Sequence, residues 1–250
     1  MNNPVEDLEN RIYAYLRQQS ELYGAVNFDM APKSDERMNK AELTDISRII
    51  QQPYQADPRL GSINTLDDLE VYCNTLDLLK TDLPNTRLVF GKGNPDADLM
   101  IIGEAPGADE DRLGEPFVGR SGQLLTKILE AIQFNRQDVY IANILKHRPP
   151  DNRNPLPEER LRSLPYLIRQ IELVQPKLIL CLGKVPTETL LQTKASLKEL
   201  RGKFHTFMGR YQVLLTYHPA YLLRDPHKKR DTWHDVQLLR SRYDELGCKP

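Results

Sequence analysis

The N-terminal quarter of the chain carries only weak helical patterns. Apolar residues recur at helical spacing over residues 5–23, which predicts one amphipathic helix. Residues 27–62 mix proline, aspartate, lysine and glutamine around a short apolar patch at 46–50, which indicates a linker with one weak helix. A further helix is expected over 65–80, with Thr65 as its N-cap.

From about residue 86 the pattern changes to apolar strands that alternate with periodic helices. Strands are expected at residues 87–91, 98–103, 138–146 and 177–183, with a hairpin over 203–219 whose second strand is 211–217. Helices are expected at 121–134, 157–175, 187–192 and 229–246. Strands separated by helices predict an α/β fold, namely three α/β/α layers around a central, mostly parallel sheet. We therefore divide the chain into an N-terminal extension, 1–62, and an α/β domain, 63–250.

In such sheets the functional loops follow the carboxyl ends of the strands. Three loops meet this condition, 103–119, 146–156 and 217–226, and they hold most of the unusual residues of the chain. Their convergence at one edge of the sheet predicts the site.

Composition narrows the class of protein. No apolar run approaches the ~20 residues that cross a bilayer, and the N-terminus is polar, so we expect no membrane segment and a cytoplasmic protein. Three scattered cysteines give no disulfide framework and fit a reducing compartment. With a net charge of −1, binding to nucleic acid would depend on local basic patches, and 146–153 and 218–230 are the candidates.

The segment 103–125 combines five acidic residues with five glycines. It lacks the spacing of phosphate-binding or dinucleotide-binding loops, and its acids would repel a polyphosphate. Phe117 is the one aromatic residue of the segment. It could anchor the loop in the core, or it could be a platform on which a flat ring stacks.

Five segments together give the chain a specific resemblance: GEAPGADED, PFVGRSGQLL, IANILKHRPPDNRNPLPEE, VFGKGNPDADLM and TYHPAYLLR. In their order and spacing, from about residue 86 to 240, they resemble the family-4 uracil-DNA glycosylases. The resemblance implies a uracil-DNA glycosylase-like fold. It also implies a monofunctional hydrolase that extrudes uracil from DNA and cleaves its N-glycosidic bond in base-excision repair.

The resemblance also assigns candidate residues. It implies uracil binding by Ala105, Glu110, Phe117, Asn143 and His218. Phe117 would stack on the ring, Asn143 would read its polar edge, and His218 would stabilise negative charge on O2. The alternative for Asn143 is a strand-end cap. Water activation is left open between Glu104 and Asn152, because related glycosylases place an aspartate where this chain has Ala105.

DNA contacts are expected from two kinds of side chain. Leu222 and Leu223 would form the wedge that fills the gap left by the extruded base. Phosphate contacts are expected from four arginines: Arg120, Arg148, Arg153 and Arg224. The expected partner is single- or double-stranded DNA that contains uracil, bound by a monomer.

Members of the resembled family usually carry an iron–sulfur cluster on four cysteines. Here the corresponding positions are Leu76, Leu79, His147 and Ser163, so we expect neither the 4Fe-4S cluster nor another cofactor or metal. Two alternatives to the glycosylase hypothesis follow from these departures. The chain could be an inactive module that binds and senses damaged DNA, or a glycosylase for another deaminated base.

Overall fold

The computed structural model describes residues 57–248. The helix predicted over 5–23 and the weak helix near residues 46–50 lie outside the described residues. The short 3-10 helix η1, Leu60–Ser62, belongs to the N-terminal unit, and the residues from Ile63 onward form a second compact unit. The proposed extension 1–62 stays a prediction, since most of it is not described.

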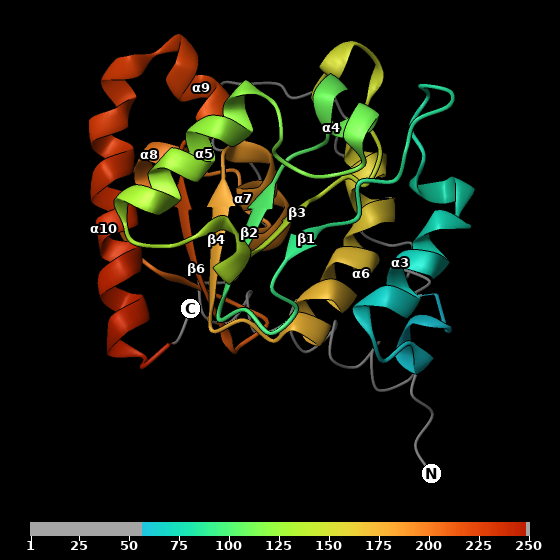
Figure 1. Ribbon diagram of the computed structural model, residues 1–250, viewed down its shortest axis with the longest axis horizontal. Helices are drawn as coiled ribbons and strands as arrows, with labels where there is room; N and C mark the ends of the chain where they lie inside the picture. Colours follow the sequence, from blue (N-terminus) through green and yellow to red (C-terminus); the bar gives the residue numbers. More distant parts are fainter. Residues whose placement is uncertain (1–56, 249–250) are drawn as a thin grey trace, which may run out of the picture. The chain divides into compact units, whose positions relative to one another are not determined.

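The second unit is built on one six-stranded sheet with the strand order β1-β3-β2-β4-β6-β5 (Figure 1). Its strands are β1 Lys92–Gly93, β2 Leu99–Gly103, β3 Tyr140–Asn143, β4 Leu178–Leu182, β5 His205–Phe207 and β6 Tyr211–Thr216. The four inner strands run parallel, and β1 and β5 pair antiparallel at the two edges. The predicted hairpin is therefore confirmed as β5 and β6.

Helices cover both faces of the sheet, which confirms the predicted α/β architecture. They are α3 Leu66–Asn74, α4 Ala108–Leu113, α5 Arg120–Ala131, α6 Pro157–Val174, α7 Lys184–Leu191, α8 Leu197–Leu200, α9 Pro219–Arg224 and α10 Lys229–Glu245. Short 3-10 turns complete the unit: η2 Asp77–Leu79, η3 Arg136–Asp138, η4 Pro150–Asn152 and η5 Pro226–Lys228. None of the helices in the described part is long and apolar enough to cross a membrane.

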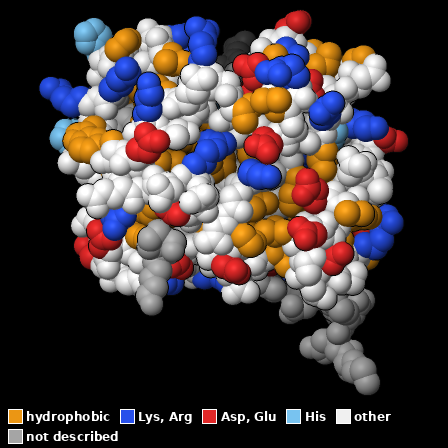
Figure 2. All heavy atoms as spheres, in the orientation of Figure 1, with side chains coloured by type: hydrophobic (Ala, Val, Ile, Leu, Met, Phe, Trp, Pro, Cys, Tyr) orange, Lys and Arg blue, Asp and Glu red, His pale blue; other side chains and the backbone are white. Residues whose placement is uncertain are grey.

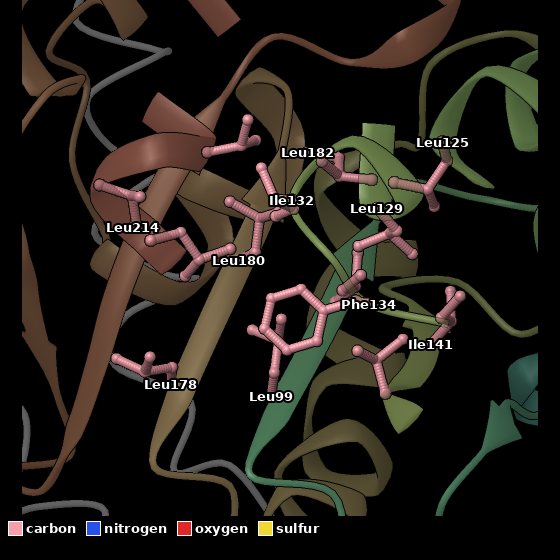
Figure 3. Close-up of a cluster of buried hydrophobic side chains, with 14 of the residues drawn as sticks. Leu99, Leu125, Leu129, Ile132, Phe134, Ile141, Leu178, Leu180, Leu182 and Leu214 are labelled. Atoms are coloured by element: carbon pink, nitrogen blue, oxygen red, sulfur yellow. The ribbon is translucent and has the colours of Figure 1, made fainter. Parts of the chain in front are cut away.

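Alternate strand residues form the core between the sheet and two helices. Leu99, Leu180 and Leu214 point to the face covered by α5 and α10, where they pack with Leu125, Leu129 and Phe134 (Figure 3). Every residue of β2 and β4 is buried, as expected for inner strands of a parallel sheet with helices on both faces. Burial of this continuous apolar surface is the main stabilising contribution.

The predicted strand at 87–91 is wrong. The chain there makes one strand-like bond, from the Val89 N–H to the Lys146 carbonyl at 2.8 Å, and then leaves β3. The Phe90 carbonyl instead accepts from two side chains, Lys146 and Gln170. Edge pairing with β3 resumes only at Lys92.

Other elements also differ from the prediction: β3 spans Tyr140–Asn143 rather than 138–146, and α7 begins at Lys184 rather than at 187. Thr65 caps α3 as expected, accepting from the Asp68 N–H at 3.1 Å, but the helix ends at Asn74 rather than continuing to residue 80. The acidic loop after β2 contains the short helix α4, which the sequence pattern did not reveal. Local capping at Gly107 by Glu110, rather than apolar periodicity, sets that helix.

A buried ion pair links α10 to the sheet. Asp235 accepts from Arg201 Nε at 2.7 Å and from the Thr216 hydroxyl at 2.6 Å, and Asp235 is 2% exposed. Burial raises the pKa of Asp235 even beside Arg201 and Thr216. The net contribution of such a pair is small, but removal of one partner leaves the other charge uncompensated.

We predict that Asp235→Ala lowers the free energy of unfolding by about 1–3 kcal/mol, because the buried Thr216 hydroxyl loses its acceptor and Arg201 keeps only its longer contact with Asp231, at 3.6 Å. Asp244→Ala is the matched control, since Asp244 pairs with Arg240 at the surface and such pairs contribute at most about 1 kcal/mol. Urea denaturation of both variants measures the difference. Equal losses for the two variants would contradict the role assigned to Asp235.

Candidate active site

At the carboxyl ends of β2 and β3, the Phe117 ring and the Asn143 amide meet beside Gly103. Gly103, the last residue of β2, lies opposite Asn143, the last residue of β3. A Cβ at Gly103 would lie 2.5 Å from Cζ of Phe117 and would also overlap Oδ1 of Asn143. Only a residue without a side chain therefore lets the ring and the amide meet over the strand ends. In Figure 1 the arrowheads of β2 and β4 point toward the end where α4 and α9 lie.

Phe117 is held in an unusual backbone conformation. Its φ is 53°, in the left-handed region that non-glycine residues rarely adopt, and 6% of the residue is exposed. Oε1 of Glu110 accepts from the N–H groups of Val118 and Gly119, both at 2.9 Å. On the other side Arg136 donates to the Pro116 carbonyl. The two charged residues fix the turn that carries the ring.

Glu110 is thus fully used by the loop itself. Its second oxygen accepts from the Gly107 N–H at 3.2 Å, so both oxygens bind main-chain donors. The expected contact between Glu110 and uracil stays a prediction. The observed bonds give this acid a positioning role.

Asn143 has an unsatisfied acceptor. The residue is 2% exposed, and its Oδ1 is buried without a hydrogen-bond partner among the described residues. A buried acceptor left unpaired costs about 1–3 kcal/mol. An orphan acceptor of this kind beside an aromatic ring indicates that a ligand supplies the missing donor.

His218 forms a third wall of this site. Its ring centroid lies 5.6 Å from that of Phe117, with an interplanar angle of 32°. Nδ1 accepts from the Ala220 N–H at 3.1 Å, so the proton of the neutral ring is on Nε2. Burial, with a smaller effect of Arg224, lowers the pKa of His218 from 6.5 to about 4. The ring is therefore a neutral Nε2–H donor near neutral pH.

Glu104 and Ala105 follow Gly103 directly and are partly buried. Desolvation by burial raises the pKa of Glu104, and Arg160 opposes that shift. The Glu104 carbonyl accepts from the Leu145 N–H at 3.1 Å, which ties this loop to the end of β3. Glu104 is thus a carboxyl group beside the strand end that carries the site.

The loop 146–156 differs from its prediction as a basic patch. Lys146 and His147 are buried, with 0% and 3% exposure. Arg148 donates to Oδ1 of Asn152 at 2.8 Å, and Arg153 makes two bonds to buried Glu159 at 2.7 and 2.8 Å. These cations are engaged within the protein, and Asn152 lies on an exposed turn with a φ of 52°.

Helix α9 presents one of the two predicted wedge leucines. Leu222 is 1% exposed and faces the interior, so it is unsuited to contact DNA, whereas Leu223 is 46% exposed. The period of the helix places these neighbours on different sides. Arg224 and Arg120 are exposed, and the helices that carry them, α9 and α5, contact each other. Figure 2 shows Lys and Arg side chains gathered over the upper half of the visible face.

The positions that correspond to cluster ligands do not fit a cluster. Leu79, His147 and Ser163 are buried, and His147 Nδ1 lies 3.0 Å from the Thr86 hydroxyl. Leucine offers no donor atom, and the chain has only three cysteines. Within residues 57–248 no three His, Cys, Asp or Glu side chains are grouped to hold a metal ion. Four thiolate ligands are what an iron–sulfur cluster requires.

The roles of two cations of this region, buried Lys146 and partly buried Arg136, escaped the sequence analysis. Lys146 reaches the Asn143 carbonyl at 2.9 Å, and Arg136 binds the loop before Phe117. A lysine directly after an apolar strand run was the available signal for Lys146. Nothing in the local pattern marked Arg136, because its contact spans 20 residues.

We predict that His218 titrates near pH 4 in an NMR titration of the folded protein. Because its folded pKa lies below the ordinary 6.5, the unfolded chain binds this proton more readily. The resulting stability is complete above pH 6.5 and is lost as the pH falls toward about 4. Urea denaturation across this window should show a smaller fall for His218→Asn than for the wild type. Titration of His218 near 6.5 would refute the assignment.

Comparison with known proteins agrees with this geometry. Residues 90–239 match the profile of the uracil DNA glycosylase superfamily. The chain is 39% identical over 187 residues to the type-4 uracil-DNA glycosylase of Archaeoglobus fulgidus, covering 71% of this chain and 92% of that relative. It is 42% identical over 162 residues to the type-4 uracil-DNA glycosylase of Thermotoga maritima, covering 64% and 84%. A type-5 uracil-DNA glycosylase of Pyrobaculum aerophilum is 31% identical over 176 residues, covering 62% and 75%. The chain therefore belongs to the uracil-DNA glycosylase superfamily.

Proposed function

We propose that this protein is a uracil-DNA glycosylase that binds extruded uracil between Phe117, Asn143 and His218 and hydrolyses its N-glycosidic bond. The observation that carries the proposal is the convergence of ring, amide and imidazole at Gly103, with Oδ1 of Asn143 buried and unpaired. Extrusion of a base costs a few kcal/mol of stacking and pairing. Stacking on Phe117 and hydrogen bonds to Asn143 offset that cost.

The amide of Asn143 distinguishes uracil from cytosine. Its free Oδ1 accepts from N3–H of uracil, while its NH2 group donates to O4. Cytosine has an unprotonated N3 and an amino group at these places, so both contacts become repulsive. A site that leaves buried polar groups unpaired with the wrong ligand discriminates strongly.

His218 stabilises the leaving group. Cleavage puts negative charge on O2 of uracil, and a preorganised donor that faces this charge lowers the barrier. The neutral Nε2–H of His218 is such a donor, and its tautomer is set by the Ala220 N–H.

Glu104 is our choice for the group that acts on water or on the positive charge of the sugar. It follows Gly103 directly, whereas Asn152 lies on an exposed turn and binds Arg148. A carboxyl group whose pKa is raised by burial accepts a proton more readily near neutral pH. Ala105 offers no side chain for this role.

The exposed Leu223 fits the wedge that replaces the extruded base, with Arg224 and Arg120 beside it for phosphate contacts. Arg148 and Arg153 order the loop 146–156, and any contact they make with DNA would compete with Asn152 and Glu159. We further propose a monomer that acts on single- or double-stranded DNA in the cytoplasm, with residues 1–62 as an extension of the catalytic domain 63–250.

The enzyme is proposed to work without an iron–sulfur cluster. Its former ligand positions hold leucine, histidine and serine side chains. His147 bonds to Thr86 and the side chain of Leu79 is buried. Packing and ordinary hydrogen bonds then hold the loop after Arg148. Within the described residues no contact favours another deaminated base over uracil.

We predict that Asn143→Ala lowers kcat/KM for uracil excision by about 100- to 1000-fold, the usual effect of losing one preorganised donor or acceptor at a reacting group. His218→Ala should lose a similar factor, mainly in kcat, since it acts on the departing anion. Release of uracil from a single-stranded oligonucleotide measures both. Asn154→Ala is the control, because Arg153 donates to the main-chain carbonyl of Asn154, which the substitution keeps. Equal rates for Asn143→Ala and the control would overturn the proposal.

We predict that protein purified without oxygen contains no stoichiometric iron and shows no cluster absorbance in visible light. Uracil release should be unchanged by a chelator that strips iron, because the residues at the ligand positions cannot bind it. Elemental analysis together with the chelator assay checks this. Iron at about four atoms per chain, lost together with activity, would show that the cluster-free proposal is wrong.

A further inference from the structure

Lys146 is a buried cation that the proposed reaction leaves without a role. It is 0% exposed, and no carboxylate pairs with it among the described residues. Its ammonium donates to the Asn143 carbonyl at 2.9 Å, to the Phe90 carbonyl at 3.3 Å and to Oε1 of Gln170. Three neutral acceptors use its three donors. A charge buried without a counter-charge is costly, and hydrogen bonds offset only part of that cost.

Lys146 lies where the edge of the sheet is irregular. The chain at Phe90 lies outside β1, close to the end of β3, and the main-chain carbonyls of Phe90 and Asn143 come within reach of one side chain. The Lys146 ammonium bridges both. Gln170 of α6 completes the arrangement, donating to the Phe90 carbonyl at 3.0 Å and to the Tyr140 hydroxyl at 3.3 Å.

A neutral side chain could satisfy part of this arrangement, so the charge itself calls for an explanation. The carbonyl that Lys146 binds belongs to Asn143, whose side chain would read uracil. The group that departs in the proposed reaction is an anion. The Lys146 ammonium lies one hydrogen bond from the main chain of the residue proposed to bind the base. A fixed positive charge in a region of low dielectric stabilises negative charge that develops near it without any reorganisation.

We infer that Lys146 is a positioning residue of the proposed glycosylase reaction: its buried ammonium fixes the main chain that carries Asn143 and stabilises the departing uracil anion electrostatically. The inference rests on the proposed function. The reaction would then use two groups to stabilise the anion: the neutral donor His218 and the positive charge of Lys146, held at the end of β3.

The protonation of Lys146 gives this inference a signature. Burial lowers the pKa of Lys146 from 10.5 to about 7. The charge is present below that pH and is lost above it, so the rate of the chemical step should fall as pH rises through about 7. Three titratable groups lie nearby: Cys73 of α3, Tyr140 of β3 and the adjacent His147. Burial raises the pKa of Tyr140 and lowers that of His147, so both stay neutral above pH 7.

The test compares Lys146→Met with the wild type in single-turnover excision on a uracil-containing single strand, with substrate affinity measured separately. The expected result is a rate lower by about tenfold to a hundredfold, the range for a hydrogen bond to a charged group. Affinity for uracil DNA should change less than the rate, and the fall of rate above pH 7 should disappear. The double variant Lys146→Met with Asn143→Ala should lose less of the excision rate than the product of the two single-variant fold losses.

Two further variants separate this role from simple destabilisation. Leu129 is a core residue of α5 and makes no hydrogen bond to Lys146 through its side chain. Leu129→Ala should therefore lower stability but keep the wild-type rate per folded molecule. Gln170→Glu places a carboxylate against the ammonium, so it keeps a partner for Lys146 but cancels the charge. We expect it to slow excision and to move the alkaline fall of rate to higher pH. This variant also tests the inference if Lys146→Met fails to fold.

The inference would be overturned if Lys146→Met and Gln170→Glu kept the wild-type rate and pH profile. It would also be overturned if Leu129→Ala, at equal stability, lost as much excision activity as Lys146→Met. Failure of the proposed function looks different, because wild-type protein would then release no uracil at all.

Discussion

The close approach of β2 and β3 at their carboxyl ends is the constraint on which the site depends. The parallel register puts Gly103 directly opposite Asn143, and the missing side chain of Gly103 leaves the space that the Phe117 ring and the Asn143 amide enter. Because the strands are buried on both faces, neither can shift without exposing core residues. The rigidity of the sheet thereby limits the movement of Phe117 and Asn143, the two residues proposed to hold uracil.

Several costly features surround this point, and each is compensated by a nearby charge. Phe117 adopts a left-handed backbone, which the carboxylate of Glu110 and the guanidinium of Arg136 hold from either side. The Phe90 and Asn143 carbonyls both accept hydrogen bonds from the buried Lys146 ammonium. Oδ1 of Asn143 is buried without a hydrogen-bond partner among the described residues, in the place where a ligand would provide one. Strain and unpaired groups that gather at one place are typical of a functional site.

The region where the resembled family would place cluster ligands and the candidate site depend on different interactions. Leu79 of η2 lies against α6 and His147 bonds to Thr86, whereas the candidate site is set by the sheet register and by Glu110. Glu159 holds Arg153 and thereby the turn that follows, a task that needs no metal. The loop 146–156 therefore has its own network of charged hydrogen bonds.

The sequence by itself determined the layered α/β architecture, the inner strands and the family, because buried strands and amphipathic helices have different apolar periods and because five motifs occur in a fixed order. Through that resemblance it also proposed Phe117, Asn143 and His218 as site residues, and the structure brings these three side chains together. Only the tertiary structure decided that Leu222 faces inward, that 87–91 is not a strand, and that Lys146 is an interior charge rather than part of a DNA-binding patch. The physical reason is the same in each case. Period and composition are local properties, whereas burial of one particular side chain depends on contacts with segments 20 to 60 residues away, as between Arg136 and Pro116 or Lys146 and Phe90.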